Sequence, residues 1–298
     1  MKDKALCILA GWGLRRCGTL PVIGINKRNL DYIYPSNSRR DFLLADDKIL
    51  TKEVLTRAGV PLPETYRIYG HFFELLHLEK DLGPYQDFVI KPSQGSGGGG
   101  VIIITGRGET YWKGIGGATY TTAGLKKHIS DIIFGVYSFD LTDRALVEAR
   151  VIQHDDMSVL SPFGLADVRV IHYRDEPALA MTRLPTKASN GRANLHQGAV
   201  GVGIDLETGR TIHAVLGGEG VDRHPDTGVS VIDMPIPYWD EVLSVSRRAA
   251  SAVPLKYLGV DIAISRTGPV LIEINVRPGL EIQNANMRGL RPQLERLG

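Results

Sequence analysis

The 298-residue chain has a formal net charge of +2 at pH 7, and 43% of its residues are hydrophobic and 23% are charged. This composition is typical of a globular protein, and the length allows one large domain or two to three lobes. The near-neutral charge and the lack of an aromatic and basic stripe argue against a nucleic-acid partner. No apolar run is long enough to span a membrane, so no membrane partner is expected either.

The two cysteines, Cys7 and Cys17, are too few for a disulfide framework or a zinc site, and we expect a cytoplasmic protein. A short apolar run at residues 5–14 follows two lysines and loosely resembles a signal peptide. The run contains two glycines and lacks a small-residue cleavage site, so a short N-terminal packing helix is the preferred interpretation.

Helices are predicted at four places along the chain. Two aspartates and a glycine bound the first, over 44–58, and a glycine–proline pair ends the second, over 71–82. Either Thr121 or Thr122 can cap the third, which runs to about residue 134. The fourth covers 238–252 and carries Val242, Val245 and Ala249 on one face.

Strands are predicted from short apolar runs bounded by turn residues. They cover 88–92, 101–104, 145–152, 168–173, 178–183, 198–205 and 210–214, and a hairpin follows between 259 and 275. The strands cluster more than they alternate with helices, which favours an α+β fold over a doubly wound parallel sheet.

The hairpin near the end of the chain has a distinctive pairing. Two apolar runs flank residues 266–268, and a three-residue loop folded about Thr267 places Asp261 directly opposite Glu273. Side chains alternate between the two faces of a strand, so the opposite face is expected in the core. That face carries Ile262, Ile264, Ile272 and Ile274.

The polar face of this hairpin predicts a metal site. Glu273, Asn275 and Arg277 share a face with Asp261. Like charges directly opposite each other are destabilising, which weakens the alternative of an ordinary half-exposed hairpin. Carboxylate and amide oxygens without thiol or imidazole suit a hard cation, Mg²⁺ or Mn²⁺, which commonly shares the phosphates of a nucleotide.

A run of glycines lies between two predicted strands, in Lys91-Pro-Ser-Gln-Gly-Ser-Gly-Gly-Gly-Gly100. Glycines let the backbone approach phosphate oxygens and point N–H groups at them, and Lys91 directly precedes the run. A Walker loop has a different spacing and is followed by a helix, so we reject that assignment. We interpret the segment as a flap over phosphates, with a merely flexible hairpin loop as the alternative.

Six separated motifs together resemble the ATP-grasp ligases. In chain order they are Asp47-Lys48, Ala58-Gly-Val-Pro-Leu-Pro-Glu-Thr65, Val89-Ile-Lys-Pro with its glycine loop, Leu146-Val-Glu-Ala-Arg150, Gly259-Val-Asp261, and Glu273-Ile-Asn275 with Pro278-Gly279. Three more resemble the ligases that add glutamate to a ribosomal protein: Asp167-Val-Arg169, Met181-Thr-Arg183 and Arg192-Ala-Asn-Leu-His-Gln-Gly198. Ile23-Gly-Ile-Asn-Lys-Arg-Asn29 resembles the related α-L-glutamate-ligase-like proteins.

The resemblance implies two α+β lobes that hold ATP between them, and a role for each matching position. Nucleotide binding is implied for Lys48, Lys91, Ser93, Gly95, Ser96, Gly97, Gly98, Gly99, Glu148, Ala149, Val151, and Asp155 or Asp156. Metal binding is implied for Asp261, Glu273 and Asn275. Contacts with the γ-phosphate and the substrate carboxylate, and hence catalysis, are implied for Arg169, Arg183, Asn194, His196 and Arg277.

The implied reaction is the ATP-dependent joining of a carboxylate and an amine through an acyl phosphate, with glutamate or another amino acid as the added group. Positioned cations and Mg²⁺ are what such phosphoryl chemistry requires. The expected substrates are small molecules or peptides, and a protein acceptor is also open. The alternatives are an ATP-grasp kinase or glycan-assembly enzyme, and a nucleotide-binding regulator without turnover.

The chain departs from the superfamily pattern in two segments. The part before Lys48 is shorter than the usual N-terminal lobe, so substrate binding can involve another subunit and we expect a homo-oligomer. The predicted divisions are a truncated N-terminal segment at 1–45, a subdomain with the glycine flap at 46–145 and a C-terminal subdomain with the metal hairpin at 146–298. Residues 106–122 match the ribosomal-protein ligases poorly and are interpreted as a lid or recognition loop.

Overall fold

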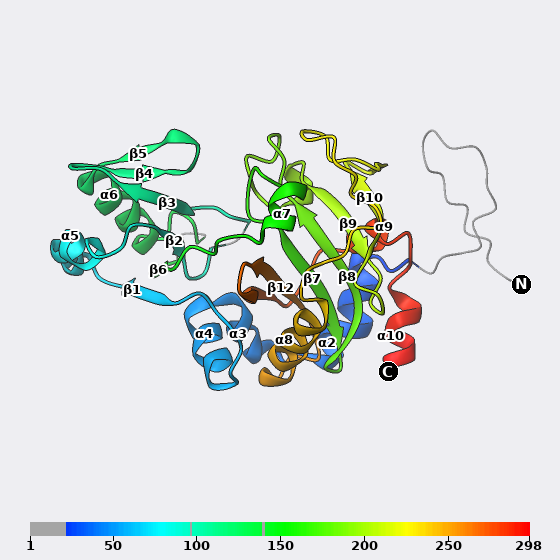
Figure 1. The fold of residues 1–298 in the computed structure, drawn as a ribbon. Helices are drawn as coiled ribbons and strands as arrows, with labels where there is room; N and C mark the ends of the chain where they lie inside the picture. Colours follow the sequence, from blue (N-terminus) through cyan, green and yellow to red (C-terminus); the bar gives the residue numbers. More distant parts are fainter. Residues whose placement is uncertain (1–21, 96, 139–140) are drawn as a thin grey trace, which may run out of the picture.

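The structure is a computed structural model that describes residues 22–95, 97–138 and 141–298. The expected N-terminal helix, both cysteines and Ser96 lie outside the described residues. Two antiparallel sheets, one of six strands and one of seven, form the centres of two lobes (Figure 1). The α+β prediction is therefore confirmed. In the described ranges, no helix has the length and apolar character needed to cross a membrane.

The smaller lobe is built on a sheet with the strand order β1-β6-β2-β3-β4-β5. Its strands are β1 (Thr65–Tyr69), β2 (Phe88–Pro92), β3 (Ile102–Arg107), β4 (Trp112–Gly114), β5 (Thr119–Tyr120) and β6 (Ala145–Glu148). Its helices are η3 (Phe72–His77), α5 (Leu78–Leu82), η4 (Ile115–Gly117) and α6 (Thr122–Ile133). Thr121 caps α6 by accepting a hydrogen bond from the Gly124 N–H, as predicted. Phe88, Trp112 and Ile129 belong to a core of their own in this lobe.

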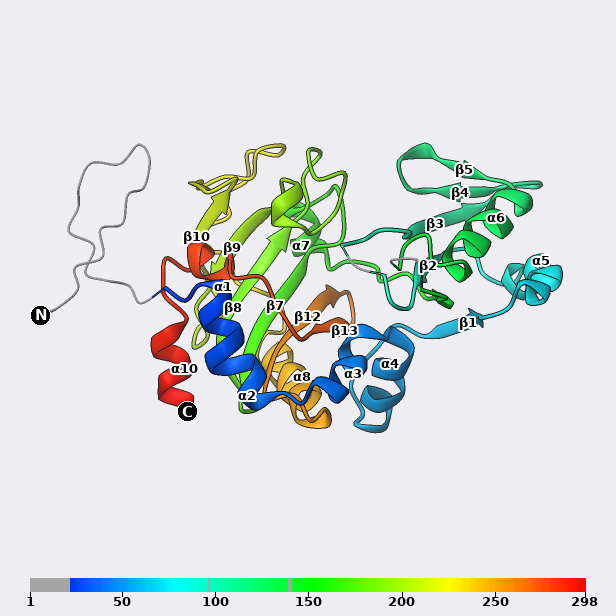
Figure 2. The same ribbon diagram turned by 180° about the vertical axis from the view of Figure 1, so that it is seen from behind.

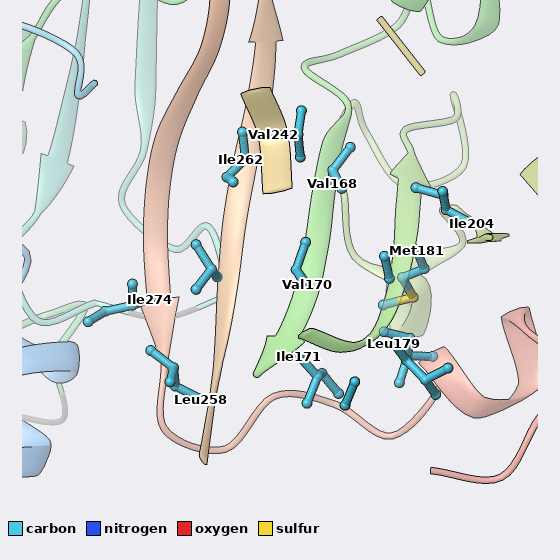
Figure 3. Close-up of a cluster of buried hydrophobic side chains, with 14 of the residues drawn as sticks. Val168, Val170, Ile171, Leu179, Met181, Ile204, Val242, Leu258, Ile262 and Ile274 are labelled. Carbon is cyan, nitrogen blue, oxygen red and sulfur yellow. The ribbon is translucent and has the colours of Figure 1, made fainter. Parts of the chain in front are cut away.

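The larger lobe has the strand order β11-β10-β9-β8-β7-β12-β13. Its strands are β7 (Asp167–Tyr173), β8 (Glu176–Leu184), β9 (Val200–Ile204), β10 (Thr211–Leu216), β11 (Glu219–Gly220), β12 (Tyr257–Ser265) and β13 (Gly268–Asn275). Its helices are α7 (Asp155–Leu160), η5 (Leu195–Gln197), α8 (Trp239–Ala252), α9 (Ile282–Ala285) and α10 (Arg291–Leu297). On one face of the sheet, Val168 and Ile262 pack with Val242 of α8 (Figure 3).

The helices at the start of the described chain pack with this larger lobe. They are α1 (Ile25–Arg28), η1 (Asn29–Ile33), α2 (Tyr34–Ser36), η2 (Arg39–Phe42), α3 (Leu43–Asp46) and α4 (Lys48–Arg57). Together with α10, α1 and α2 cover the sheet face opposite α8 (Figure 2). Asp47 divides the helix predicted over 44–58 and caps α4, because its carboxylate accepts from Ile49 N at 2.9 Å and from Leu50 N at 3.3 Å.

Helix α4 precedes the smaller lobe in the chain, yet its buried Leu55 belongs to the core of the larger lobe. The chain therefore leaves the larger lobe after α4, builds the smaller sheet from β1 to β6, and returns. The predicted divisions at 45/46 and 145/146, and the shortened N-terminal lobe, stay predictions.

The hairpin of β12 and β13 pairs Asp261 with Glu273 as predicted, but by a different route. Ser265 pairs with Gly268, so the loop has two residues and the predicted three-residue loop is wrong. This register alone would place Asp261 opposite Ile272. A β-bulge at Ile272 shifts the pairing by one residue, from Ile262 opposite Leu271 to Asp261 opposite Glu273.

The bulge also corrects the predicted core. Ile262, Ile264 and Ile274 are fully or almost fully buried, as expected. Leu271, at 1% exposure, joins them in place of Ile272. Ile272 is only half-buried and faces the cleft between the lobes, so the prediction that it belongs to the core is wrong. The extra residue of a bulge reverses the alternation of faces, which an unbroken two-residue period does not anticipate.

Candidate functional site

Two adjoining cavities lie where the smaller sheet faces the larger lobe. The first has a volume of about 570 Å³ and is lined by β2, the glycine loop and the segment 148–153 after β6. The second has a volume of about 860 Å³ and is lined mainly by the larger lobe, including the loop 190–196. The glycine loop, Ile115 and Glu273 line both cavities. We call them the nucleotide cavity and the substrate cavity, after the roles that the sequence predicts.

A cluster of two lysines and one carboxylate lies beside the nucleotide cavity, which Lys91 and Glu148 line. Lys91 of β2 pairs with Oε1 of Glu148, and Nζ of Lys52 on α4 lies 2.6 Å from Oε2. Burial would raise the pKa of Glu148, but the two ammonium groups outweigh it and lower that pKa. Burial lowers the pKa of Lys52, although Glu148 acts in the opposite direction. The carboxylate is ionised and has a partner on each oxygen.

The start of the glycine loop is anchored to the N-terminus of α4. Ser93 is fully buried and donates from Oγ to the Asp47 carboxylate at 2.6 Å, and Arg144 donates to the same carboxylate at 2.7 Å. Lys48 donates from Nζ to the carbonyl oxygen of Gly95 at 2.7 Å, and its Nζ lies 3.3 Å from Oε1 of Glu273. Lys48 therefore links the glycine loop to the hairpin of the larger lobe.

The substrate cavity has an arginine cluster beneath it. Arg169 of β7 donates from Nε and Nη2 to the two carboxylate oxygens of Asp261, at 2.7 and 2.6 Å. Arg183 of β8 donates to Asp261 at 2.9 Å and also pairs with Asp167. Burial would raise the pKa of Asp261, but the two guanidinium groups outweigh it and lower the pKa to about 2. Asp261 is therefore a carboxylate held in place by charge-assisted hydrogen bonds.

The predicted metal ligands lie together, and their donor atoms fit a hard cation. Glu273 and Asn275 line the substrate cavity, and Asp261 is buried directly beside them. Nδ2 of Asn275 donates to Asp261 at 3.0 Å, which leaves the amide oxygen as its acceptor end. The described residues contain no group of three or more His, Cys, Asp or Glu side chains suited to a metal, and the set here is two carboxylates and one amide. All of its donors are oxygens, the chemistry that Mg²⁺ and Mn²⁺ prefer.

Most of the other predicted residues line the two cavities. In the nucleotide cavity are Lys48, Lys91, Gly95, Gly97, Gly98, Gly99, Glu148, Ala149 and Val151. In the substrate cavity are Arg169, Arg183, Asn194 and His196. Asn194 accepts from the His196 N–H at 3.0 Å, which fixes the turn that presents both side chains.

Besides the buried Asp261, and Asp156 as the alternative to Asp155, three predicted residues in the described part of the chain line neither cavity. Ser93 lies beneath the glycine loop and serves its anchorage. Asp155 is exposed and pairs with Arg266 at 2.8 Å, although Arg266 itself lines the nucleotide cavity. Arg277 is exposed and its guanidinium lies 5.3 Å from the ring centre of Phe42. Their predicted ligand contacts stay predictions.

Sequence reasoning missed several residues that the structure places in or beside the two cavities, among them Lys52, Ile115 and Ile272. Lys52 lies within a predicted helix, and only its spacing of four residues from Lys48 could have indicated a shared face. Ile115 belongs to the β4–β5 hairpin, in the segment predicted as a lid. Ile272 was missed because the bulge reverses its side.

The fold and the arrangement of the site define a class of protein. Residues 27–298 match the family described as sugar-transfer associated ATP-grasp, and the chain belongs to this ATP-grasp family. The predicted fold family is confirmed.

The chain is also similar to proteins that are named as ligases. A probable alpha-L-glutamate ligase of Trichodesmium erythraeum (strain IMS101) is 25% identical over 249 residues, which cover 84% of this chain and 62% of that protein. The ribosomal protein bS6–L-glutamate ligase of Escherichia coli O139:H28 (strain E24377A / ETEC) is 23% identical, over 83% and 61%. The chain thus spans about three fifths of the length of these relatives. A solved structure of the ATP-grasp ligase PsnB with a minimal precursor is similar at a TM-score of 0.44 and 18% identity, over 88% of this chain and 62% of that one.

Proposed function

We propose that the protein is an ATP-dependent carboxylate–amine ligase that forms an amide or peptide bond through an acyl phosphate. The observation that carries this proposal is the junction of the two cavities at Glu273. One cavity offers lysines and a glycine loop, which suit a triphosphate, and the other lies over an arginine pair, which suits a carboxylate. Family membership and the ligase names of the relatives support the proposal.

The nucleotide cavity would take ATP. The adenine would lie against the segment from Glu148 to Val151, where backbone groups can read its edge, and Ile272 would provide an apolar surface. Lys48 and Lys91 would bind the α- and β-phosphates, and the glycine loop would close over the γ-phosphate with its N–H groups. Asp261, Glu273 and Asn275 would hold Mg²⁺ or Mn²⁺, which when bound neutralises phosphate charge.

The reaction would proceed in two steps. A carboxylate oxygen of the first substrate attacks the γ-phosphorus, the bond to the β-phosphate oxygen breaks, and ADP leaves. An amine nitrogen then attacks the carbonyl carbon of the acyl phosphate, inorganic phosphate leaves, and the nitrogen loses a proton. Arg169 and Arg183 would orient the carboxylate and the transferring phosphoryl group, while His196 and Asn194 line the far side.

The substrates are proposed by class. The added group is glutamate or another amino acid, as the names of the relatives suggest, and the acceptor is a small molecule, a peptide or a protein. A second candidate function, an ATP-grasp step in glycan assembly, is favoured by the family's description as sugar-transfer associated. A cytoplasmic location and a homo-oligomer remain predictions.

The test is ADP release from Mg-ATP with the twenty amino acids, singly and in pairs, with products identified by mass spectrometry. Ligation predicts stoichiometric ADP and a product heavier by one amino acid residue. ADP release that needs a sugar or glycan acceptor and no amine would support the glycan-assembly function. ATP binding without ADP release, including with acceptors from cell extract, would reject both functions in favour of a nucleotide-binding regulator.

A further inference from the structure

The carboxylate of Glu148 has two lysine partners, one for each oxygen. Lys91 pairs with Oε1, and Lys52 lies 2.6 Å from Oε2. The side chains are 5% exposed for Glu148, 10% for Lys91 and 15% for Lys52, so all three charges are largely withdrawn from water. One carboxylate neutralises only one ammonium group, and the cluster has one positive charge in excess.

The two lysines share one small hollow, but only Lys91 also faces the nucleotide cavity. Lys91 and Glu148 line the nucleotide cavity, and Lys52 does not. Lys52 lines a hollow between α4 and β13 together with Lys91 and Glu148, and it also lines a groove of about 630 Å³ along α4 and β1. Lys52 does not line the nucleotide cavity itself, and its hydrogen-bonded link to that cavity is through Glu148.

Lys52 also connects the two lobes. Its helix, α4, packs in the core of the larger lobe, while Glu148 and Lys91 belong to the smaller sheet. Nζ of Lys52 donates to the carbonyl oxygen of Pro63 at 2.7 Å, in the segment that joins α4 to β1. Pro63 and Glu148 thus hold the ammonium group from two sides and keep it against the carboxylate.

We propose that Lys52 is a positioning residue that keeps Glu148 ion-paired when Lys91 turns from Glu148 to a phosphate of the bound nucleotide. This inference rests on the proposed nucleotide site. Without Lys52, the departure of Lys91 would leave a buried carboxylate without a partner, which is strongly unfavourable. With Lys52 in place, Glu148 keeps one charge partner, and the excess positive charge is free for the phosphate.

The test is the affinity for ATP, measured by titration calorimetry on the full chain without carboxylate or amine substrates. Lys52→Met removes the charge and keeps most of the length of the side chain, so among the described residues Lys91 is the ion-pair partner that Glu148 retains. We expect ATP affinity to fall by about 10-fold or more, because binding would strand the carboxylate. Glu148→Gln in the same chain removes the charge that retains Lys91. The double variant should therefore regain affinity, to within about threefold of Glu148→Gln alone.

Two further variants make the test specific. Lys52→Arg keeps the charge and should bind ATP within about threefold of the wild type. Lys127→Met is the matched control, because Lys127 is also a helix lysine paired with a carboxylate, Asp131, at 2.7 Å, but 77% of its side chain is exposed. This control should leave ATP affinity unchanged.

Unchanged ATP affinity in Lys52→Met, or additive effects of Lys52→Met and Glu148→Gln, would overturn the inference. If Lys52→Met does not fold, the test uses Lys52→Arg and the double variant Lys52→Met/Glu148→Gln. A tenfold or greater loss of ATP affinity in both, relative to the wild type and to Glu148→Gln respectively, would overturn the inference. The ligase proposal fails separately: a wild-type protein that binds ATP and ligates nothing rejects the ligase and leaves the role of Lys52 standing.

Discussion

The two lobes each bring a buried carboxylate to the cleft, but they hold it with different cations. Glu148 of the smaller sheet is held by two lysines, whose ammonium groups are compact charges on flexible stems. Asp261 of the larger sheet is held by Arg169 through two parallel hydrogen bonds and by Arg183 through a third. The guanidinium fork fixes direction as well as charge.

The difference suggests that the lysine cluster and the arginine cluster have different roles. A lysine can leave one oxygen for another by rotating its stem, which suits a cluster that exchanges a carboxylate for a phosphate. A bidentate arginine pair resists such exchange and suits a cluster that must keep a ligand oxygen and a substrate carboxylate in fixed positions. The lysine cluster lies on the nucleotide side and the arginine cluster on the substrate side, as this reasoning requires.

The largest effect is expected for Asp261→Asn. This change removes the negative charge that pairs with the two arginines and alters the shape of the side chain little. Arg169 would then lose its carboxylate partner, while Arg183 would keep its pair with Asp167. We expect the free energy of unfolding to fall by about 3–5 kcal/mol, the usual cost of breaking a buried ion pair. Urea denaturation at pH 7 measures this loss. Glu148→Gln is the matched change in the lysine cluster, and an equal loss there would contradict the proposed difference in rigidity.

The next largest effect is expected at Glu273, where the two cavities meet. Glu273→Ala removes a proposed metal ligand and the partner of Lys48. We expect ADP release to fall about 100- to 1,000-fold, the range seen when one transition-state contact is removed. The side chain is 31% exposed, so the free energy of unfolding should change little. Glu281→Ala, in the same substrate cavity, is the control, and undiminished ADP release in Glu273→Ala would sink the metal assignment.

A buried histidine without an ion-pair partner should lower the stability in acid as these carboxylate clusters do, but at a higher pH. His172 is fully buried in β7, its Nδ1 lies 3.2 Å from the Asp175 carbonyl oxygen, and burial lowers its pKa from 6.5 to about 4. The unfolded chain therefore binds a proton between pH 6.5 and 4 that the folded protein does not. As the pH is lowered from 6.5 to 4, the free energy of unfolding should fall by up to about 1.4 kcal/mol per pH unit.

The arginine cluster loses stability only at lower pH. The pKa of Asp261 is lowered to about 2 in the folded protein, so its stabilising contribution is lost as the pH falls from about 4, where the unfolded carboxyl begins to bind a proton, toward 2. Denaturation at several pH values separates the two contributions. In His172→Gln, which cannot titrate, the slope between pH 6.5 and 4 should become shallower. An unchanged slope would show that His172 is not the group responsible.

Sequence reasoning located the hairpin pair because it depends on one local rule, the alternation of faces about a loop. It placed Asp261 opposite Glu273 correctly and the loop incorrectly, and two deviations compensated each other: the loop is one residue shorter and the bulge at Ile272 adds one residue. A bulge is fixed by packing on both sides of the strand, which a single strand sequence does not contain. The side on which Ile272 lies could therefore be known only from the structure.

Contacts between segments that are distant in the chain were the other feature that the sequence could not predict. Lys52 and Glu148 are 96 residues apart, and nothing near either one indicates the other. The packing of α4 with the larger lobe likewise depends on Leu55 entering a core formed mainly by residues after 150. The cavity-lining residues that the sequence did indicate lie in short motifs that can be recognised one at a time, such as Lys91 with the glycines that follow it, although their partners are distant in the chain.

The smallest effect is expected at Ile115, where the two cavities join. It tests whether the hairpin of β4 and β5 helps to exclude water from the site. Ile115 lies in the hairpin of β4 and β5, lines both cavities, and is 52% exposed. Ile115→Ala should change the free energy of unfolding by no more than about 0.5 kcal/mol, as for most exposed side chains. If this hairpin helps to exclude water from the acyl phosphate, the ratio of ADP to ligated product should rise by roughly two- to threefold through hydrolysis.

Tyr111→Ala is the control, because Tyr111 belongs to the same segment, is 39% exposed and lines neither cavity. Equal ratios in the two variants would assign the exclusion of water to the glycine loop alone, and the predicted lid at 106–122 would then be wrong.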